Sequence, residues 1–307
     1  MKAVVFENKA LQLREVEKPT PGSGEVLVKI RAVALNAADY RSMSLGAIPK
    51  GRIFGADVAG QVEAVGPDVT RFKMGDAVFG DLSGCGFGGL AEYAAAPERL
   101  LAAKPAGVSD ADAAASAMAA VTALQGLRLG NLKAGQNVLI YGAGGGVGNF
   151  AVQLARHLGA RATAVCGPAN VELMRSLGAE RVIDYTREDF AADGQRYDLI
   201  LAVNGSRPLG DYRRALNPRG VLVTVGGELS QVFKTMLFGP LLSLGGRKAR
   251  LLAAKPNVPD LEFIAGLVAQ GRIRPVIDRR YPLEQTAEAV AYLARGHARG
   301  KVIVEVG

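Results

Sequence analysis

The sequence predicts a two-domain α/β protein in which a doubly wound parallel sheet is inserted into an all-β unit. Residues 1–120 hold short alternating or β-branched runs separated by turn signals, which indicates a compact all-β unit. From residue 121 to about 256, strands alternate with helical stretches, a pattern typical of βαβ units. A closing apolar strand at 301–306 is more like the first strands. We therefore expect residues 257–307 to return to the first domain.

The first domain is predicted from strand-like runs and the turns between them. The stretches PTPGSG, VGPD and KMGD supply the Gly, Pro and Asp residues that turns require. An Ala-rich stretch at 110–130 has high helix propensity and no proline, so it predicts one or two helices near the domain junction. The strand-like runs are KAVVF, LQLREVE, EVLVKIRAVAL, DVAGQVEAV and DAVFGDL.

The second domain is predicted from continuous apolar strands, which fit a parallel sheet buried on both faces. The helical stretches NFAVQLARHLG and NVELMRSLGA lie between them. After Gly226 the pattern is less regular, with an apolar, basic segment at 232–255 and a helix expected at 261–271. The strands are NVLIY, RATAVC, RVIDY, DLILAV and GVLVTVG.

A glycine-rich loop at 142–148 follows the first of these strands and precedes a helix. The dinucleotide fingerprint G-x-G-x-x-G is met there as Ala143, Gly145 and Gly148. Its middle glycine lets the backbone approach a pyrophosphate, and its last glycine lets helix and strand pack closely. The helix N-terminus offers free N–H groups and partial positive charge to the phosphates. The strand, loop and helix together predict a dinucleotide site.

The end of the second strand bears on the choice of cofactor. An acid there would accept the ribose hydroxyl of NAD and repel the additional phosphate of NADP. Residues 161–171 contain no acid, which favours NADP(H) over NAD(H). Residues 166–170 supply no cation either, and Arg187 and Arg175 are the nearest candidates.

Composition excludes several classes of protein. The net charge of +8 is spread along the chain, which argues against a nucleic-acid partner. No apolar run reaches the roughly 18 residues of a membrane span, and the N-terminal segment lacks a signal-peptide pattern, so we expect a cytoplasmic protein without membrane insertion. The two cysteines, Cys85 and Cys166, indicate neither a disulfide framework nor a Cys-based zinc site.

The chain contains, in this order, the motifs LNAADYRS, FGADVAGQVEAVG, FKMGDAVFG, GGLAEYAAAP, AAVTALQGL, GAGGGVGNFAVQLA, SLGAERVIDY and GHARGKVIVEV. With them it resembles the medium-chain dehydrogenase/reductase superfamily, in the zinc-free quinone oxidoreductase-like branch that includes the chloroplast envelope type. The resemblance implies a GroES-like catalytic domain over 1–120, completed by 257–307, and a Rossmann domain over 121–256. It also implies an active-site cleft where they meet and a homodimer.

Zinc-dependent members of the superfamily place a Cys early in the β domain and Gly-His-Glu where this chain has Gly55, Ala56 and Asp57. The chain has neither that Cys nor that His, and its histidines are His157 and His297. A catalytic zinc needs about three N, S or O ligands and an open position. We therefore expect no zinc.

Without a metal to polarise an alcohol or carbonyl, the favoured reaction is hydride transfer to a quinone or to the C=C of an α,β-unsaturated carbonyl compound. Developing enolate charge then requires hydrogen-bond donors, and a proton arrives from a tyrosine or from water. The resemblance places Asn36 and Tyr40 in the cleft as catalytic residues. Asn36 would position the ligand or donate to its oxygen, and Tyr40 would donate a proton or line the pocket. Local packing is the alternative for both.

The resemblance also implies the cofactor contacts. Relatives that bind NADPH commonly have Ser and Lys where this chain has Gly167 and Asn170, so the preference for NADPH rests on the missing acid. Thr122 would lie near the nicotinamide and Tyr185 at the adenosine ribose. The full set is Thr122, Ala143, Gly145, Gly146, Val147, Gly148, Gly167, Asn170, Tyr185 and Arg187.

Two other functions stay open. One is an NADPH-binding sensor or RNA-binding protein with little turnover, which the positive charge permits, although no RNA motif or aromatic-basic platform is readable. The other is a dedicated enoyl reductase of a biosynthetic pathway, with the same chemistry and a different substrate. The loops around a pocket set substrate choice, so the sequence pattern does not distinguish a dedicated enoyl reductase from a general quinone or enone reductase.

Overall fold

The computed structural model describes residues 1–49, 51–227 and 246–307. The chain divides into two compact units, one of Met1–Val121 with Lys255–Gly307 and one of Thr122–Ala254. Most of the apolar, basic segment predicted at 232–255 lies outside the described residues. In the part of the chain that is described, no helix is both long and apolar enough to cross a membrane.

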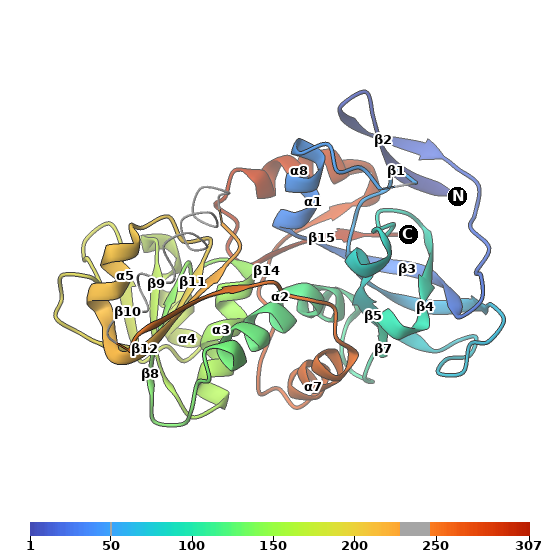
Figure 1. Cartoon of the computed structure of the whole chain (residues 1–307). Helices are drawn as coiled ribbons and strands as arrows, with labels where there is room; N and C mark the ends of the chain where they lie inside the picture. Colours follow the sequence, from blue (N-terminus) through green and yellow to red (C-terminus); the bar gives the residue numbers. More distant parts are fainter. Residues whose placement is uncertain (50, 228–245) are drawn as a thin grey trace. The chain divides into compact units, whose positions relative to one another are not determined.

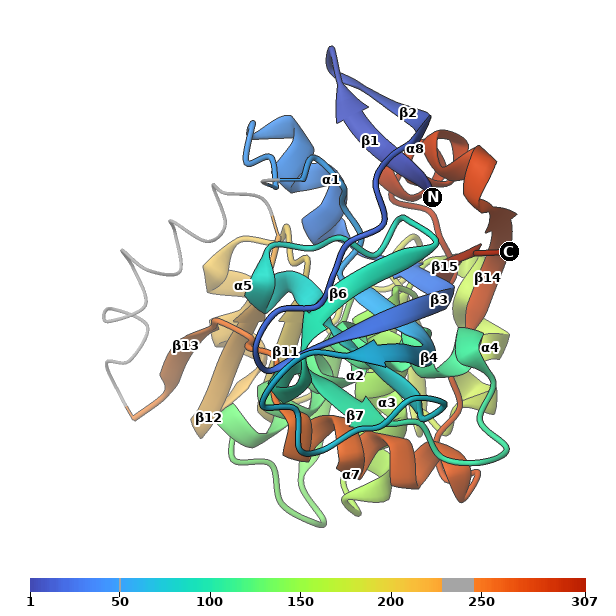
Figure 2. The same ribbon diagram turned by 90° about the vertical axis from the view of Figure 1, so that its right-hand side faces the viewer.

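The first unit is built on a mainly antiparallel sheet whose central strand is β3 (Glu25–Leu35). In the described residues its strands follow the order β14-β15-β3-β4-β5-β7. Strand β6 pairs with β3, beside which it lies in Figure 2. A separate hairpin joins β1 to β2. The remaining strands are β1 (Lys2–Glu7), β2 (Ala10–Glu15), β4 (Asp57–Val65), β5 (Ala77–Asp81), β6 (Tyr93–Pro97), β7 (Leu101–Ala103), β14 (Ile277–Pro282) and β15 (Lys301–Glu305).

Strand β15 brings the far end of the sequence into this sheet. It pairs antiparallel with β3, with Val302 opposite Leu35, and parallel with β14. Figure 1 shows the red β15 beside the blue β3. Its first four residues are buried, because the strand lies inside the sheet and not at an edge. The end of the chain therefore lies in the sheet of the first unit.

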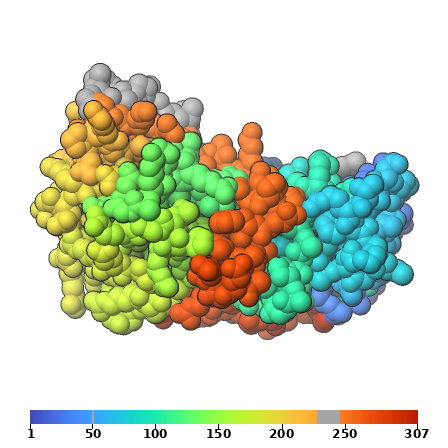
Figure 3. Space-filling model, turned by 90° about the horizontal axis from the view of Figure 1, so that it is seen from below, coloured from blue at the N-terminus to red at the C-terminus, as the bar shows by residue number. Residues whose placement is uncertain are grey.

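The helices of the first unit pack by small apolar side chains. Alanines of α2 (Asp110–Leu129) share a buried cluster with Ala32, Ala34 and Ala59 of the sheet, and such short side chains let helix and strand approach closely. In Figure 3 the orange-red α7 lies at the surface, where Phe263 is 37% exposed. The helices other than α2 are α1 (Ala37–Ser44), α7 (Val258–Ala269) and α8 (Thr286–Ala294), with 3-10 turns at Leu82–Cys85, Glu98–Leu100 and Leu283–Gln285.

The second unit contains a parallel sheet whose described strands follow the order β10-β9-β8-β11-β12-β13. Every pairing in it is parallel. The strand order reverses between β8 and β11, and ligands of open α/β sheets bind at the carboxyl ends of the strands at such a reversal. The strands are β8 (Asn137–Tyr141), β9 (Arg161–Cys166), β10 (Arg181–Asp184), β11 (Tyr197–Val203), β12 (Leu216–Val225) and β13 (Lys248–Leu252). The helices are α3 (Gly146–His157), α4 (Val171–Ser176) and α5 (Leu209–Ala215), with a 3-10 turn at Pro168–Asn170.

Candidate active site

The glycine loop lies at the strand-order reversal of the second unit. Gly142 directly follows β8 and has a φ of +75°, a conformation that side chains with a Cβ rarely adopt. A Cβ there would also lie 2.3 Å from the carbonyl oxygen of Val203, the last residue of β11. The backbone after β8 therefore lies too close to the end of β11 for any residue except glycine at position 142.

Gly145 and Gly148 have opposite surroundings within the same loop. A Cβ on Gly148 would lie 2.4 Å from the Gly142 oxygen and 2.5 Å from the Ala143 Cα, so this glycine permits α3 to pack on the strand. A Cβ on Gly145 would have a single neighbour within 4 Å, the Gly142 oxygen at 3.8 Å. The backbone at Gly145 is therefore open on its outer side, as the approach of a pyrophosphate requires.

The first turn of α3 completes a cradle for a dinucleotide. Gly145 caps the helix in extended conformation, and Gly146 and Val147 begin it. Their N–H groups precede the intrahelical ladder, so they are available to an anionic ligand and carry the positive end of the helix dipole. Ala143 is fully buried in the position of the first fingerprint glycine. The residues present thus fit the pyrophosphate of a nicotinamide dinucleotide.

The loop after β9 lies against the glycine loop. A Cβ on Gly144 would lie 2.6 Å from Nδ2 of Asn170, so the asparagine side chain covers the glycine loop. A Cβ on Gly167 would lie 3.0 Å from the hydroxyl of Tyr185, whose side chain is exposed. The structure therefore brings together Gly167, Asn170 and Tyr185 at one corner of the loop.

A carboxylate that the sequence analysis missed lies beside this corner. Asp184 ends β10 and pairs in register with Cys166, the last residue of β9. Its Oδ1 accepts hydrogen bonds from N of Thr186 at 2.9 Å and from its Oγ1 at 2.8 Å, which lower the pKa of Asp184. Arg187 Nε lies 3.8 Å from Asp184 Oδ2, and the Arg187 side chain is 83% exposed. Arg187, the cation considered as a partner for the 2′-phosphate of NADPH, thus already interacts with Asp184.

Thr122 lies on α2, where it is buried. It is the first residue of the second unit. Its role near the nicotinamide stays a prediction.

In the first unit, Asn36 belongs to a buried polar cluster at the end of β3. Its Nδ2 donates to the Ala34 carbonyl at 3.1 Å and to Asp57 Oδ2 at 2.9 Å. Its Oδ1 accepts from Nζ of Lys301 at 2.6 Å. Lys301 also donates to the Leu35 carbonyl at 3.0 Å and to Asp57 Oδ2 at 3.3 Å. Lys301 was not predicted as a site residue, because a lysine that opens an apolar strand is typical of a solvated strand end.

Two buried carboxylates support this cluster. Asp57 is fully buried, its Oδ1 accepts from N of Met118 at 3.0 Å, and burial raises its pKa against the opposing effect of Lys301. Asp39 accepts from N of Asn36 at 2.8 Å and from N of Gly55 at 3.1 Å. Burial raises the pKa of Asp39 to about 6, because these two backbone hydrogen bonds only partly offset the loss of solvation. Asp39 thus ties the start of α1 to the segment before β4.

Tyr40, on α1, lines an apolar hollow of about 770 Å³ in the first unit. Such a volume suits a drug-sized apolar molecule. The polar side chains on its wall are Lys9, Tyr40 and Ser44, and Ser44 donates to the Tyr40 carbonyl at 2.9 Å. The apolar side chains that line it are Phe6, Ala10, Leu11, Met43, Ile48, Ala287, Val290 and Ala291.

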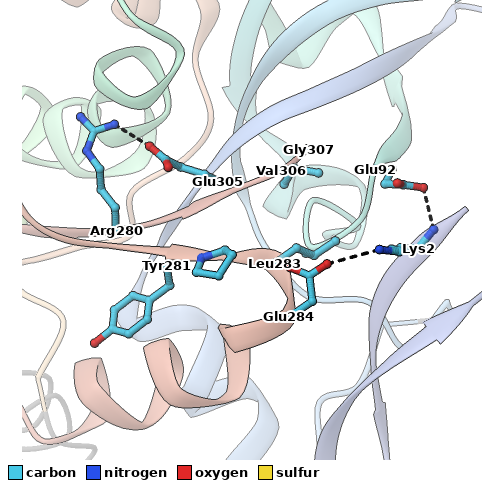
Figure 4. Close-up of a pocket in the computed structure, with 10 residues that line it drawn as sticks. Lys2, Glu92, Arg280, Tyr281, Leu283, Glu284, Glu305, Val306 and Gly307 are labelled. Carbon is cyan, nitrogen blue, oxygen red and sulfur yellow. Dashed lines mark hydrogen bonds and ion pairs between the residues drawn. The ribbon is translucent and has the colours of Figure 1, made fainter.

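A smaller hollow of about 410 Å³ in the same unit has a different character (Figure 4). Lys2 pairs with Glu284 at 3.5 Å and Arg280 with Glu305 at 2.7 Å, and Glu92 accepts a hydrogen bond from the backbone N of Lys2 at 2.7 Å. Its wall is therefore strongly polar, with more carboxylates than cations, which does not suit an apolar substrate. The apolar hollow at Tyr40 is the better candidate for a substrate.

The residues at the position of the catalytic zinc do not fit a metal. Ala56 offers no ligand atom, and Asp57 is paired with a lysine ammonium, which would repel a cation. Throughout the described ranges, no three His, Cys, Asp or Glu side chains gather as a metal site requires. That the protein uses no zinc stays a prediction.

Two family models match separate parts of the chain. Residues 22–106 match the alcohol dehydrogenase GroES-like domain, and residues 177–304 match a family described as zinc-binding dehydrogenase. The chain is 36% identical over 312 residues to a chloroplast envelope quinone oxidoreductase homolog from Arabidopsis thaliana, covering 95% of this chain and 92% of the relative. It is 32% identical to an NADPH-dependent alkenal/one oxidoreductase from the same plant, covering 91% of this chain and 72% of that protein.

Among solved structures, the quinone oxidoreductase from Coxiella burnetii superposes with a TM-score of 0.88 at 28% identity, over 100% of this chain and 98% of that one. The fold and the loop together define an oxidoreductase of the nicotinamide-dependent dehydrogenase type. The chain belongs to the medium-chain dehydrogenase/reductase superfamily, in its quinone oxidoreductase branch. The predicted family and fold class are confirmed.

Proposed function

We propose that the protein is a zinc-independent, NADPH-dependent reductase of quinones or of the C=C of α,β-unsaturated carbonyl compounds. The observation that carries the proposal is the glycine loop at the reversal of strand order, with Gly145 open to a ligand and Gly148 closed by packing. Relatives named as quinone oxidoreductase and alkenal/one oxidoreductase support the substrate class. The apolar hollow beside Tyr40 supports a substrate of low polarity.

The cofactor's chemistry and the chain's own contribution are separate. A bound nicotinamide supplies a hydride from C4. The loop from Ala143 to Gly148 would hold the pyrophosphate, with Gly146 and Val147 offering N–H groups, and Thr122 would border the nicotinamide. Tyr40 would give the proton or line the substrate site, and Asn36 would position the ligand.

A preference for NADPH over NADH is part of the proposal. The loop after β9 holds no acid, and the nearby Asp184 is already occupied by Thr186 and Arg187. Gly167, Asn170 and Tyr185 would contact the adenosine ribose and its phosphate. An exposed Arg187 adds on the order of 1 kcal/mol, or at most about tenfold in affinity. The relative named as NADPH-dependent supports this choice.

Three further assignments complete the proposal. The first unit would be the catalytic domain and the second the cofactor domain. The protein would act as a homodimer, as its family resemblance implies. It would be cytoplasmic.

The test is NADPH oxidation, followed at 340 nm (the absorbance of the reduced nicotinamide), against a panel of quinones, alkenals and enones. We expect turnover of at least one electron-poor substrate, unchanged after exhaustive chelation. Turnover of a single enoyl compound would identify a dedicated enoyl reductase. Tight NADPH binding without turnover of any substrate would instead favour the sensor function.

A further inference from the structure

The apolar hollow at Tyr40 is formed by the first unit alone. Its wall comes from the hairpin of β1 and β2, from α1 and the loop after it, and from α8. Helix α8 contacts both α1 and β2. On α8, the lining residues Ala287, Val290 and Ala291 are three and four positions apart, so they share one face of the helix. The hollow therefore needs no residue of the second unit.

A single charge stands on this wall. Among the described residues that line the hollow, Lys9 is the only charged one. The preceding acid, Glu7, pairs with Arg14 at 3.5 Å. Lys9 is exposed, so its ammonium lies at the mouth, where its aliphatic stem can extend the apolar wall. The hollow thus combines an apolar wall with one positive charge at its mouth.

Lys9 occupies a backbone position that favours glycine. Glu7 pairs with Ala10 across the hairpin, so the turn consists of Asn8 and Lys9 alone. Their φ angles are +49° and +62°, the pattern of a type I′ turn, whose second residue is most often glycine. Asparagine tolerates this left-handed conformation, whereas a lysine is strained in it. The hairpin thus accepts strain at the residue that carries the ammonium, and such strain is typical of ligand sites.

We propose that the hollow binds an amphipathic anion, whose apolar body lies on the wall and whose carboxylate, sulfonate or phosphate pairs with Lys9. The volume of about 770 Å³ suits a drug-sized molecule. Such a body would cover Ile48, an apolar side chain that is 40% exposed. The inference goes beyond the proposed function, because it names a ligand for the first unit alone and holds whether or not that ligand is reduced.

The test uses two fluorescent probes that share one apolar body. The probe 8-anilinonaphthalene-1-sulfonate carries a negative group, and N-phenyl-1-naphthylamine is its neutral counterpart. Titration of the full chain, without cofactor, gives a dissociation constant for each probe. The neutral probe reports binding to the apolar wall, so any effect confined to the sulfonate probe reports the pairing with Lys9.

Two variants separate the charge of Lys9 from its strain. Lys9→Met removes the charge and keeps the left-handed strain, so it should weaken the sulfonate probe about two- to fivefold, as an exposed ion pair does, and leave the neutral probe unchanged. Lys9→Gly should weaken the sulfonate probe equally and also raise the urea midpoint of unfolding, because glycine is not strained at positive φ. Salt at about 1 M should abolish the effect of Lys9→Met, since the Debye length falls to about 3 Å.

Two further variants serve as controls. Lys73→Met, at an 84% exposed side chain in another turn of the same unit, should change the affinity of neither probe. Ala291→Phe places a ring on the wall of the hollow and should weaken both probes at least tenfold. If Ala291→Phe does not fold, Ala287→Phe tests the same face of α8.

Equal affinity of the sulfonate probe for the unmodified protein and for Lys9→Met would overturn the pairing. Undiminished binding of both probes to a folded Ala291→Phe or Ala287→Phe protein would place them elsewhere and overturn the site. A lower urea midpoint in Lys9→Gly would overturn the strain at the turn. Probe binding that depends on Lys9, without reduction of any quinone or enone, would refute the proposed function and leave this site intact.

Discussion

The contrast between Gly145 and Gly148 predicts that two identical changes in one loop fail in different ways. Gly145→Ala places its methyl group in open space, 3.8 Å from its nearest neighbour. Its φ of −84° and ψ of 175° suit any residue. Replacing the helix cap costs at most about 1 kcal/mol of unfolding free energy. The methyl group would instead hold a pyrophosphate away from the first N–H groups of α3.

The expected loss of binding follows from those hydrogen bonds. A hydrogen bond to a charged group contributes about 1.5–3 kcal/mol, so losing one should weaken NADPH binding roughly ten- to a hundredfold. Gly148→Ala should behave differently, because its methyl group would lie 2.4 Å from a backbone oxygen. Such a contact forces the helix away from the strand and should lower the unfolding free energy by about 1–3 kcal/mol.

Two assays separate these outcomes. NADPH fluorescence titration gives the dissociation constant, and urea denaturation gives the unfolding free energy. We expect impaired NADPH binding with near-normal stability for Gly145→Ala, and reduced stability for Gly148→Ala. Unchanged NADPH affinity in a folded Gly145→Ala protein would refute the placement of the pyrophosphate. Undiminished stability in Gly148→Ala would refute the close packing.

Four other changes test separate parts of the molecule. Arg187→Ala should weaken NADPH by at most about tenfold and leave NADH unchanged, because that guanidinium is exposed and shared with Asp184; a larger loss in titration would make Arg187 a direct phosphate ligand. Gly167→Asp should reverse the cofactor preference. If this variant still bound NADPH more tightly than NADH, the placement of the adenosine ribose beside Gly167 would be contradicted. The pKa of Asp39 is raised from its ordinary value of 3.8 to about 6, so its protonated form stabilises the fold below pH 3.8 and that stabilisation, about 3 kcal/mol, is lost as the pH rises through 6. Asp39→Asn should remove this pH dependence of the unfolding free energy, and an unaltered slope between pH 4 and 6 would assign it to other groups. Gly266→Ala, inside α7 with no atom within 4 Å of the new Cβ, should raise the unfolding free energy by about 0.5–1 kcal/mol, and a decrease would reveal a hidden contact.

The local sequence pattern was enough to predict those elements whose residue types directly reflect which of their faces are buried. The runs predicted at 25–35, 57–65 and 137–141 are β3, β4 and β8, because alternation or continuous apolarity follows directly from which faces are buried. The Ala-rich stretch predicted as one or two helices is the single α2. Strand β6 was not predicted, since alanine has low strand propensity and β6 forms through its pairing with β3.

In the candidate site, too, features set by local sequence were predictable and contacts between distant segments were not. The glycine loop was predictable because its spacing is local. The neighbours of that loop were not, since Asn170 reaches Gly144 and Asp184 reaches the end of β9 only through the pairing of separate strands. The hydrogen bond from Lys301 to Asn36 joins residues that are 265 positions apart in the sequence. The one local sequence signal for Lys301 was its position at the start of an otherwise apolar strand.

The position of β15 has a consequence for the order of folding. Its pairing with β3 joins segments at the two ends of the sequence, so the sheet of the first unit closes a loop that contains the whole second unit. Closing such a long loop is slow, whereas the second unit is continuous and rich in neighbouring βαβ contacts. During synthesis the second unit can complete its sheet while β3 still exposes an unpaired edge to the cell. We expect chaperones and proteases to meet this protein chiefly at that edge, in the interval before β15 emerges from the ribosome.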